Sequence, residues 1–440
     1  MGDCPEPCEP CETYKKETSL KEEESYKITN PGALRDFAKE LHKLFSQENP
    51  MEEAYVKFLK IEKTKRRSIT NGYPPYLRNL ALYSINKWIE QFKGKVTNYM
   101  EGVESPVLYE EIQTGKNIHD LLIQKGTVFF YYKEKPFILS IDFRWDFTEV
   151  SFVYDSKDNA LGRETQENFR KFMAEHNFYK GAKLEYLQRG FLKILDFPKL
   201  ALEDVILPTE IKEEIDLNII FPIKNKEKIS KMALPWRRGV ILSGVPGVGK
   251  TQLGKVLCNV LDGVTILWTT TKAINCSEEV RRIFEAARYF SPSLMILEDI
   301  DFIGTDRELI HDPVLGELLS QLDGATPNDG VFVIATTNRP QLLDRALADR
   351  PSRFDASIYL ELPKIDERRR LFQLFLKGKP YTFDVEDMCR KTEGFTGAHI
   401  QELIIRAGLM TLKRDEEVLS PEIVEESFKK IKKKAKTLSE

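Results

Sequence analysis

The chain has 440 residues, of which 66 are basic and 69 are acidic, and its formal net charge is −3. This length predicts two or three domains at roughly 100–200 residues each, and a hydrophobic content of 41% is enough for sizeable cores. The balanced charge argues against a basic nucleic-acid-binding protein, so we expect no nucleic-acid partner. No apolar run approaches the roughly 18 residues of a membrane span, and the acidic N-terminus resembles neither a secretory signal nor a transit peptide. We therefore expect a cytoplasmic protein without a membrane span and with reduced cysteines.

The first 27 residues predict a disordered tail. They are rich in Glu, Lys, Pro and Cys and poor in large apolar side chains. Within them, Cys4, Cys8 and Cys11 have a spacing that fits an iron–sulfur cluster or a zinc site. Because no folded unit surrounds these thiols, we favour a compositional tract over a metal site, and both interpretations stay open.

Residues 28–195 predict an α+β region that we expect to engage a protein client or adaptor. Apolar residues at helical spacing predict three helices, at residues 34–45, 51–62 and 75–89. Aromatic and β-branched runs then predict a meander of three strands, at residues 127–132, 137–143 and 150–154. A helix at residues 164–176 and a short segment at 183–187 follow.

The second half of the chain alternates strands and helices. This alternation over residues 196–363 predicts a parallel α/β sheet. Residues 364–440 turn helical, with four candidate helices at 367–377, 385–392, 398–413 and 421–433. The expected fold class is therefore α/β, a parallel sheet with a C-terminal helical lid, preceded by the α+β region.

Residues 244–251 read Gly-Val-Pro-Gly-Val-Gly-Lys-Thr and fit the phosphate-loop pattern in full. An apolar run precedes the octet and a helical pattern follows it, which is the strand–loop–helix context of such a loop. Glycines let backbone N–H groups point inward, and the helix adds its positive end. Lys250 can reach the β- and γ-phosphates, and the Thr251 hydroxyl can bind Mg²⁺. The expected nucleotide-binding residues here are Gly244, Val245, Pro246, Gly247, Val248, Gly249, Lys250, Thr251 and Gln252.

Two further apolar runs end in polar side chains. Residues 294–297 lead into Glu298 and Asp299, and residues 331–337 lead into Asn338. A strand beside a phosphate loop should end in one acid that supports the Mg²⁺ shell and another that positions the attacking water. We therefore predict that Thr251 and Glu298 serve the metal and that Asp299 is catalytic.

The octet, the acidic strand and the segments after them resemble the AAA family of ATPases, over roughly residues 202–412. Those later segments read Leu-Asp-Arg-Ala-Leu-Ala-Asp-Arg-Pro-Ser-Arg-Phe-Asp at 343–355 and Phe-Thr-Gly-Ala-His at 395–399. The resemblance implies ATP and Mg²⁺ as cofactors and a ring-shaped homo-oligomer, expected to be a hexamer. It also implies site residues: Asn338 to sense the γ-phosphate, Arg350 and Arg353 to reach the neighbouring subunit's nucleotide, Gly397 and Ala398 to pack against adenine and ribose.

The acidic pair departs from the family's usual Asp-Glu order. Glu298 stands at the metal-shell position and Asp299 at the catalytic one, so each carboxylate is kept and each reach changes by one methylene. This order, like residues 234–239, resembles the branch that contains the mitochondrial Rieske-protein translocase. Other motifs resemble the cell-division-cycle and proteasomal regulatory ATPases. Residues 204–207 stand where a family segment brackets adenine, but without its usual glycines.

The expected function is an ATP-hydrolysing machine that remodels or disassembles protein clients. Two alternatives stay open: a switch or scaffold that binds ATP with negligible hydrolysis, and a motor that nucleic acid stimulates. Family members that thread unfolded protein carry an aromatic–apolar–glycine pore loop after the second core strand. Here the matching positions are Lys272, Ala273 and Ile274, without an aromatic ring or a glycine. Trp268 could substitute, but a strand residue is more often core, so we favour remodelling over threading.

Overall fold

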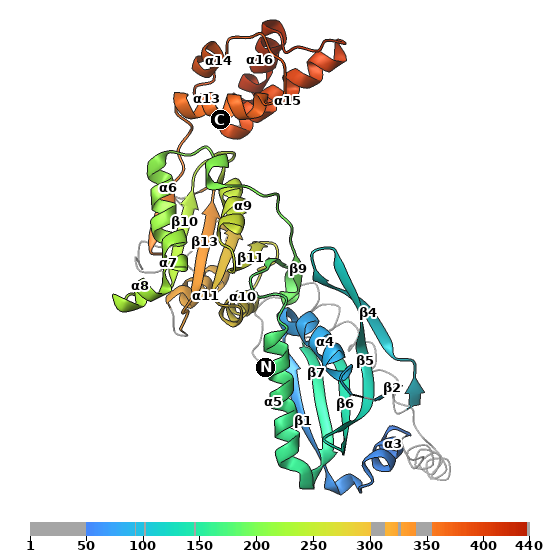
Figure 1. Cartoon of the computed structure of the whole chain (residues 1–440). Coiled ribbons are helices and arrows are strands. Elements are labelled where there is room, and N and C mark those ends of the chain that lie inside the picture. Colours follow the sequence, from blue (N-terminus) through green and yellow to red (C-terminus); the bar gives the residue numbers. More distant parts are fainter. Residues whose placement is uncertain are drawn as a thin grey trace, which may run out of the picture.

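The computed structural model describes residues 50–437, apart from residues 93, 101–102, 145–146, 301–312, 324–326 and 340–353. The expected tail at 1–27 and the expected helix at 34–45 lie outside these residues. Figure 1 shows three parts along the molecule: a β-rich N-terminal unit, a parallel sheet flanked by helices, and a C-terminal group of helices. No helix in these described ranges is both long and apolar enough to cross a bilayer.

The N-terminal unit is built on an antiparallel sheet of seven strands. The strand order is β1-β7-β6-β5-β2-β3, and β4 pairs with β5. The expected meander is present as β5, β6 and β7, but it forms less than half of the sheet. The strands are β1 (Arg66–Tyr73), β2 (Lys95–Met100), β3 (Val103–Ser105), β4 (Leu108–Gly115), β5 (Ile118–Tyr132), β6 (Lys135–Arg144) and β7 (Phe147–Asp155).

Side-chain alternation along these strands lets helices cover both faces of the sheet. Phe130 and Phe152 face α4 (Pro75–Ile89) and α5 (Asn159–Glu175), whereas the neighbouring Phe129 and Val153 face α3 (Pro50–Leu59). Helix α5 lies so close that a Cβ at Gly162 would fall 2.1 Å from the ring of Tyr154. The three helices correspond to those expected at 51–62, 75–89 and 164–176, and α5 begins five residues earlier than predicted.

The central sheet also has seven strands, in the order β14-β10-β13-β12-β11-β8-β9. Its pairs are parallel, except that β9 runs antiparallel to β8. This parallel sheet confirms the α/β fold class. The strands are β8 (Lys183–Tyr186), β9 (Leu192–Ile194), β10 (Arg238–Ser243), β11 (Thr265–Thr270), β12 (Ser293–Glu298), β13 (Val331–Thr337) and β14 (Ala356–Tyr359).

Helices cover both faces of the central sheet. Along β12, Leu294 and Ile296 pack toward one helical layer, and Met295 and Leu297 pack toward the other. The first layer contains α6 (Thr209–Ile215), the π-helical turn Asp216–Ile220, α7 (Phe221–Lys224), α8 (Lys226–Lys231) and α9 (Lys250–Val260). The second contains α10 (Ser277–Tyr289) and α11 (Pro313–Asp323). Short 3₁₀ turns lie at Lys63–Lys65, Ser156–Asp158, Gln188–Gly190 and Leu202–Asp204.

Strands β8 and β9 extend the central sheet, although residues 183–194 fall within the α+β region predicted at 28–195. Leu184 of β8 lies opposite Leu267 of β11 in a parallel register. The central sheet therefore begins earlier in the chain than residue 196. A strand of four residues, in which only every second side chain is buried, carries too little apolar pattern to reveal its partner.

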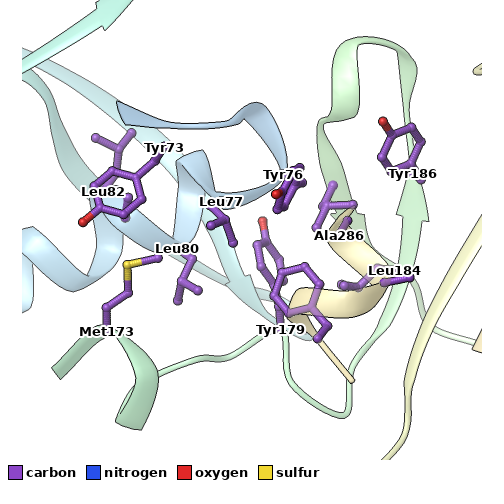
Figure 2. Close-up of a cluster of buried hydrophobic side chains, with 14 of the residues drawn as sticks. Tyr73, Tyr76, Leu77, Leu80, Leu82, Met173, Tyr179, Leu184, Tyr186 and Ala286 are labelled. Atoms are coloured by element: carbon purple, nitrogen blue, oxygen red, sulfur yellow. The ribbon is translucent and has the colours of Figure 1, made fainter. Parts of the chain in front are cut away.

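The N-terminal unit and the central sheet share one hydrophobic core. Figure 2 shows part of it, with Tyr76 and Leu77 of α4 beside Tyr179 and with Ala286 of α10 close by. The rings of Tyr76 and Tyr179 both meet Phe290 edge to face, with centroids 6.5 and 5.8 Å away. The N-terminal unit and the central sheet are therefore in direct apolar contact as well as being joined along the chain.

The C-terminal helices match the four that the sequence predicts. They are α13 (Ile365–Leu376), α14 (Val385–Lys391), α15 (Gly397–Lys413) and α16 (Pro421–Thr437). Phe372, Leu403 and Ile423 belong to a core that these helices make among themselves. Thr396 caps α15 by accepting a hydrogen bond from the backbone N–H of His399 at 3.3 Å. This cap sets the start of α15 at the edge of the central sheet.

Replacing Phe290 tests the shared core. Phe290 is 1% exposed and contacts both units, so Phe290→Ala should lower the free energy of unfolding by about 3–5 kcal/mol. Denaturant unfolding followed by circular dichroism measures this change. The matched control is Tyr109→Ala, which removes an exposed ring from β4 and should change stability by less than about 0.5 kcal/mol. Equal effects of the two substitutions would contradict a shared core.

Candidate active site

The loop between β10 and α9 has backbone angles that require glycine. The φ angles of Gly247 and Gly249 are +86° and +109°, a region that other residues rarely adopt. Space is also restricted, since a Cβ at Gly244 would lie 2.5 Å from the carbonyl oxygen of Leu360. Helix α9 begins at Lys250, directly after the loop. The loop thus presents backbone N–H groups and a helix N-terminus to the same space, as an anion site requires.

Three polar side chains meet beside this loop: Lys250 at the start of α9, and Asn338 and Asp299 directly after β13 and β12. The Lys250 ammonium donates to the Gly244 carbonyl oxygen at 2.5 Å and to Asn338 Oδ1 at 2.8 Å. Asn338 Nδ2 in turn donates to Asp299 Oδ1 at 3.0 Å. Strands β10, β13 and β12 are adjacent and parallel, so their carboxyl ends bring these residues together. The result is a chain of hydrogen bonds from Lys250 through Asn338 to Asp299.

The backbone holds Asp299 in an unusual conformation. Its φ angle is +52°, which is uncommon for a residue with a side chain. The backbone N–H of Asp299 donates to Thr336 Oγ1 of β13 at 3.0 Å. Strained residues of this kind gather at functional sites, because the surrounding structure must fix them in place. The hydroxyl of Thr336 supplies part of that restraint, and the sequence pattern did not single it out.

Glu298 and Thr251 are also brought together. The Thr251 hydroxyl donates to Glu298 Oε1 at 2.6 Å, and the indole N–H of Trp268 donates to Glu298 Oε2 at 3.1 Å. A hydroxyl and a carboxylate are oxygen ligands that suit Mg²⁺, which is usually bound by few protein groups together with substrate phosphates. The described residues contain no group of three or more His, Cys, Asp or Glu side chains arranged to hold a metal.

A pocket of about 510 Å³ lies between the phosphate loop and the C-terminal helices. This volume is in the range of sites for cofactor-sized molecules. Backbone contact joins its two sides, because the N–H of Ala398 donates to the Gly247 carbonyl oxygen at 3.2 Å. Of the expected site residues, the pocket is lined by Pro246, Gly247, Val248, Gly249, Lys250, Thr251, Gln252, Asp299, Asn338, Gly397 and Ala398.

Part of the pocket lining is apolar. Residues 204–207, expected to bracket adenine, line the pocket together with Leu371 and Phe375 of α13. A flat heterocycle would find hydrophobic contact there, while its phosphates would point toward Lys250. The contribution of α13 was not foreseen, because an apolar residue on a lid helix resembles any other core residue until the helix is placed.

The remaining expected residues divide into two groups. Gly244 and Val245 provide carbonyl oxygens to Lys250, and Glu298 lies behind Thr251, so they support the pocket without lining it. Arg350 and Arg353 lie outside the described residues, as do Cys4, Cys8 and Cys11. Burial raises the pKa of the Cys258 thiol on α9 to about 12, so this thiol stays protonated at neutral pH.

Comparison with known proteins relates the part of the chain that forms this site to a protein family. A family model described as "ATPase family associated with various cellular activities (AAA)" matches residues 240–362. A putative cell division cycle ATPase from Plasmodium falciparum (isolate 3D7) is 33% identical over 225 residues, covering 48% of this chain and 18% of that protein. The ATP-dependent zinc metalloprotease FtsH of Aquifex aeolicus (strain VF5) is 33% identical over 258 residues, covering 55% of this chain and 40% of that protein.

A solved structure on the structural basis for katanin self-assembly has a TM-score of 0.44 and 26% identity, covering 52% of this chain and 84% of that chain. This chain spans less than half the length of either curated relative. The family match begins at β10 and ends after β14, so it contains the phosphate loop, both carboxylates and Asn338. The chain therefore carries an ATPase domain of the AAA family, at residues 240–362.

Proposed function

We propose that this protein hydrolyses ATP with Mg²⁺ and uses the cycle to remodel or disassemble protein clients. The observation that carries the proposal is the hydrogen-bonded chain from Lys250 through Asn338 to Asp299 in the lining of the pocket. It joins a cation suited to phosphate oxygens with a carboxylate suited to water. The two groups lie on either side of the amide that would sense the terminal phosphate.

Each residue has a distinct task in this proposal. Lys250 binds the β- and γ-phosphates, and Asp299 accepts a hydrogen bond from the attacking water and so orients it in line with the γ-phosphate. Asn338 fixes the carboxylate of Asp299 and contacts the γ-phosphate. Mg²⁺, held through Thr251 and Glu298, would neutralise charge on the phosphate oxygens.

Two substitutions separate nucleotide binding from hydrolysis. Lys250→Ala should weaken ATP binding at least 100-fold or so, because it removes a buried cation from the phosphate site. Asp299→Asn should keep the ATP affinity within about threefold of wild type and lower turnover roughly 100-fold or more, because an amide orients water poorly. Isothermal titration calorimetry measures the affinity, and steady-state phosphate release measures the turnover.

The matched controls are Lys255→Ala, one turn farther along α9, and Asp262→Asn in the turn after it. Neither residue lines the pocket, and both variants should bind and hydrolyse ATP like wild type. If Asp299→Asn hydrolysed ATP at the wild-type rate, the catalytic assignment would be wrong. If wild type bound ATP without measurable turnover, the protein would instead be a nucleotide-dependent switch or scaffold. Stimulation by DNA or RNA would favour a nucleic-acid motor.

We also propose that the active unit is a homo-oligomer, expected to be a hexamer, in which Arg350 and Arg353 serve the neighbour's nucleotide. A guanidinium supplied from a second subunit stabilises charge on the transferring phosphoryl group. An apolar stripe on α15 is consistent with a contact between subunits. Its members, Ile405, Leu409 and Leu412, are all exposed and follow helical spacing on the face away from the lid core.

Mixing two inactive variants tests this arrangement. Arg353→Ala subunits retain an intact site, and Asp299→Asn subunits retain the arginine, so a mixed ring should contain some complete sites. We expect the mixture to recover a measurable fraction of wild-type phosphate release while each variant alone stays inactive. Turnover of wild type should also rise faster than linearly with protein concentration through the assembly range. Full activity of a monomer at every concentration would contradict the proposal.

The mode of client handling rests on the segment after β11. Ile274 is 2% exposed and belongs to the shared core, and Ala273 is also buried. Trp268 packs into the opposite face of the sheet and donates to Glu298. The side chains that could grip an extended chain are therefore engaged elsewhere. This burial supports remodelling or disassembly of folded clients over processive threading.

A folded reporter distinguishes the two modes. Green fluorescent protein with a long unstructured tail should keep its fluorescence in the presence of the full chain, ATP and Mg²⁺, as it does with ADP. Fluorescence decay measures unfolding directly. ATP-dependent loss of fluorescence that Lys272→Ala abolishes would favour threading, since Lys272 is the exposed member of the aligned pore positions. Ile274→Ser is unsuitable for this purpose because it would also damage the core.

A further inference from the structure

Trp268 occupies a position from which it can act on the metal-shell carboxylate. In the parallel register of β11 and β12, Trp268 lies opposite Ile296, and Glu298 follows two residues later on the same face. The indole N–H donates to Glu298 Oε2 at 3.1 Å. This hydrogen bond crosses between the strands at the edge of the sheet where the phosphate loop lies.

The indole ring is held by what surrounds it. A Cβ at Gly254 on α9 would lie 2.9 Å from Cη2 of Trp268, so the absence of a side chain there makes room for the ring. On another side, the ring of Phe197 lies 5.3 Å away between centroids. With the side chain 8% exposed and enclosed in this way, the direction of its N–H is fixed by packing.

A second hydrogen-bond donor matters here because the side chain of Glu298 is longer than that of an aspartate. Glutamate has one more rotatable bond than aspartate, so a carboxylate at the metal shell needs an additional restraint to stay in one place. Here both oxygens are engaged: Thr251 donates to Oε1 at 2.6 Å, and Trp268 donates to Oε2 at 3.1 Å.

We propose that Trp268 is a positioning residue that holds one oxygen of Glu298, so that the other faces Thr251 and the Mg²⁺ bound there. This inference rests on the proposed function, since it concerns the same nucleotide site. Trp268 would thus support the glutamate that the Glu-Asp order places at the metal shell. Residues that orient a metal ligand from behind commonly change metal affinity about 10–100-fold when they are replaced.

The experiment measures the ATP affinity of the full chain by calorimetry at a series of Mg²⁺ concentrations. A low temperature keeps ATP from being hydrolysed during the measurement. Trp268→Phe removes the N–H and keeps an aromatic ring in the pocket. We expect it to raise the Mg²⁺ concentration for half-maximal tightening of ATP binding about 10-fold. Its ATP affinity in EDTA should stay within about twofold of wild type, because the phosphate loop itself is unchanged.

The matched control is Trp236→Phe. Trp236 is also a buried tryptophan in the core of the central sheet, and its N–H donates to the Pro222 carbonyl oxygen at 2.9 Å, a contact that does not involve the site. Its Mg²⁺ midpoint should equal that of wild type. A second comparison uses Glu298→Asp, whose shorter side chain does not extend to the indole. In that background Trp268→Phe should change the midpoint less than twofold, which shows coupling between the two residues.

Indole emission supplies a readout that does not depend on affinity. Mg²⁺ added to the ADP complex should change the emission of wild type, and Trp268→Phe should lose most of that change. An unaltered Mg²⁺ midpoint in folded Trp268→Phe would overturn the inference while leaving the proposed ATPase intact. An equal loss of affinity in EDTA and in Mg²⁺ would also overturn it, since the tryptophan would then be a structural support of the loop. Failure of wild type to bind ATP would instead refute the proposed function.

Discussion

The rest of this structure depends on a cluster of side chains at the carboxyl edge of the central sheet. Strands β10, β13 and β12 are neighbours, and the chain Lys250, Asn338 and Asp299 forms where they end: Lys250 opens the helix that follows β10 and its loop, and Asn338 and Asp299 directly follow β13 and β12. Burying a lysine is unfavourable unless its ammonium is fully paired, and here carbonyl oxygens of the loop and the amide of Asn338 provide partners. The glycine geometry of the loop and the strained backbone of Asp299 both serve this one cluster. The lid then closes the other side of the same space.

The sequence predicts the parts of this structure whose signals are local. The phosphate loop, the carboxylates and Asn338 each follow an apolar strand, so their meeting could be foreseen from the parallel topology alone. The lid helices are likewise clear, because Gly397–Lys413 and its neighbours repeat apolar residues at helical spacing. Strands Arg66–Tyr73 and Leu108–Gly115 were missed because they carry many polar residues and bury few side chains. Contacts that join distant segments, such as Trp268 to Glu298 or α13 to the pocket, have no local signal.

The two halves of the pocket are attached to the rest of the chain in different ways. The lid keeps a core of its own, containing Phe372 and Leu403, and contacts the loop through Ala398 and Gly247. The N-terminal unit, in contrast, is fused to the central sheet through Tyr76, Tyr179 and Phe290. A ligand bound between the loop and the lid would therefore change the position of the lid relative to the central sheet far more than the position of the N-terminal unit.

With that difference in attachment, the N-terminal unit would turn together with the central sheet. A rigid arm turns through the same angle as the body to which it is fixed, so its displacement grows with distance from the pivot. Figure 1 places the lid and the N-terminal sheet at opposite ends of the molecule, with the central sheet between them. A small rotation at the nucleotide would thus reach the far strands as a larger displacement, transmitted through the core that α4 and α10 share. The hydrophobic core around Phe290 is the contact through which that displacement would pass.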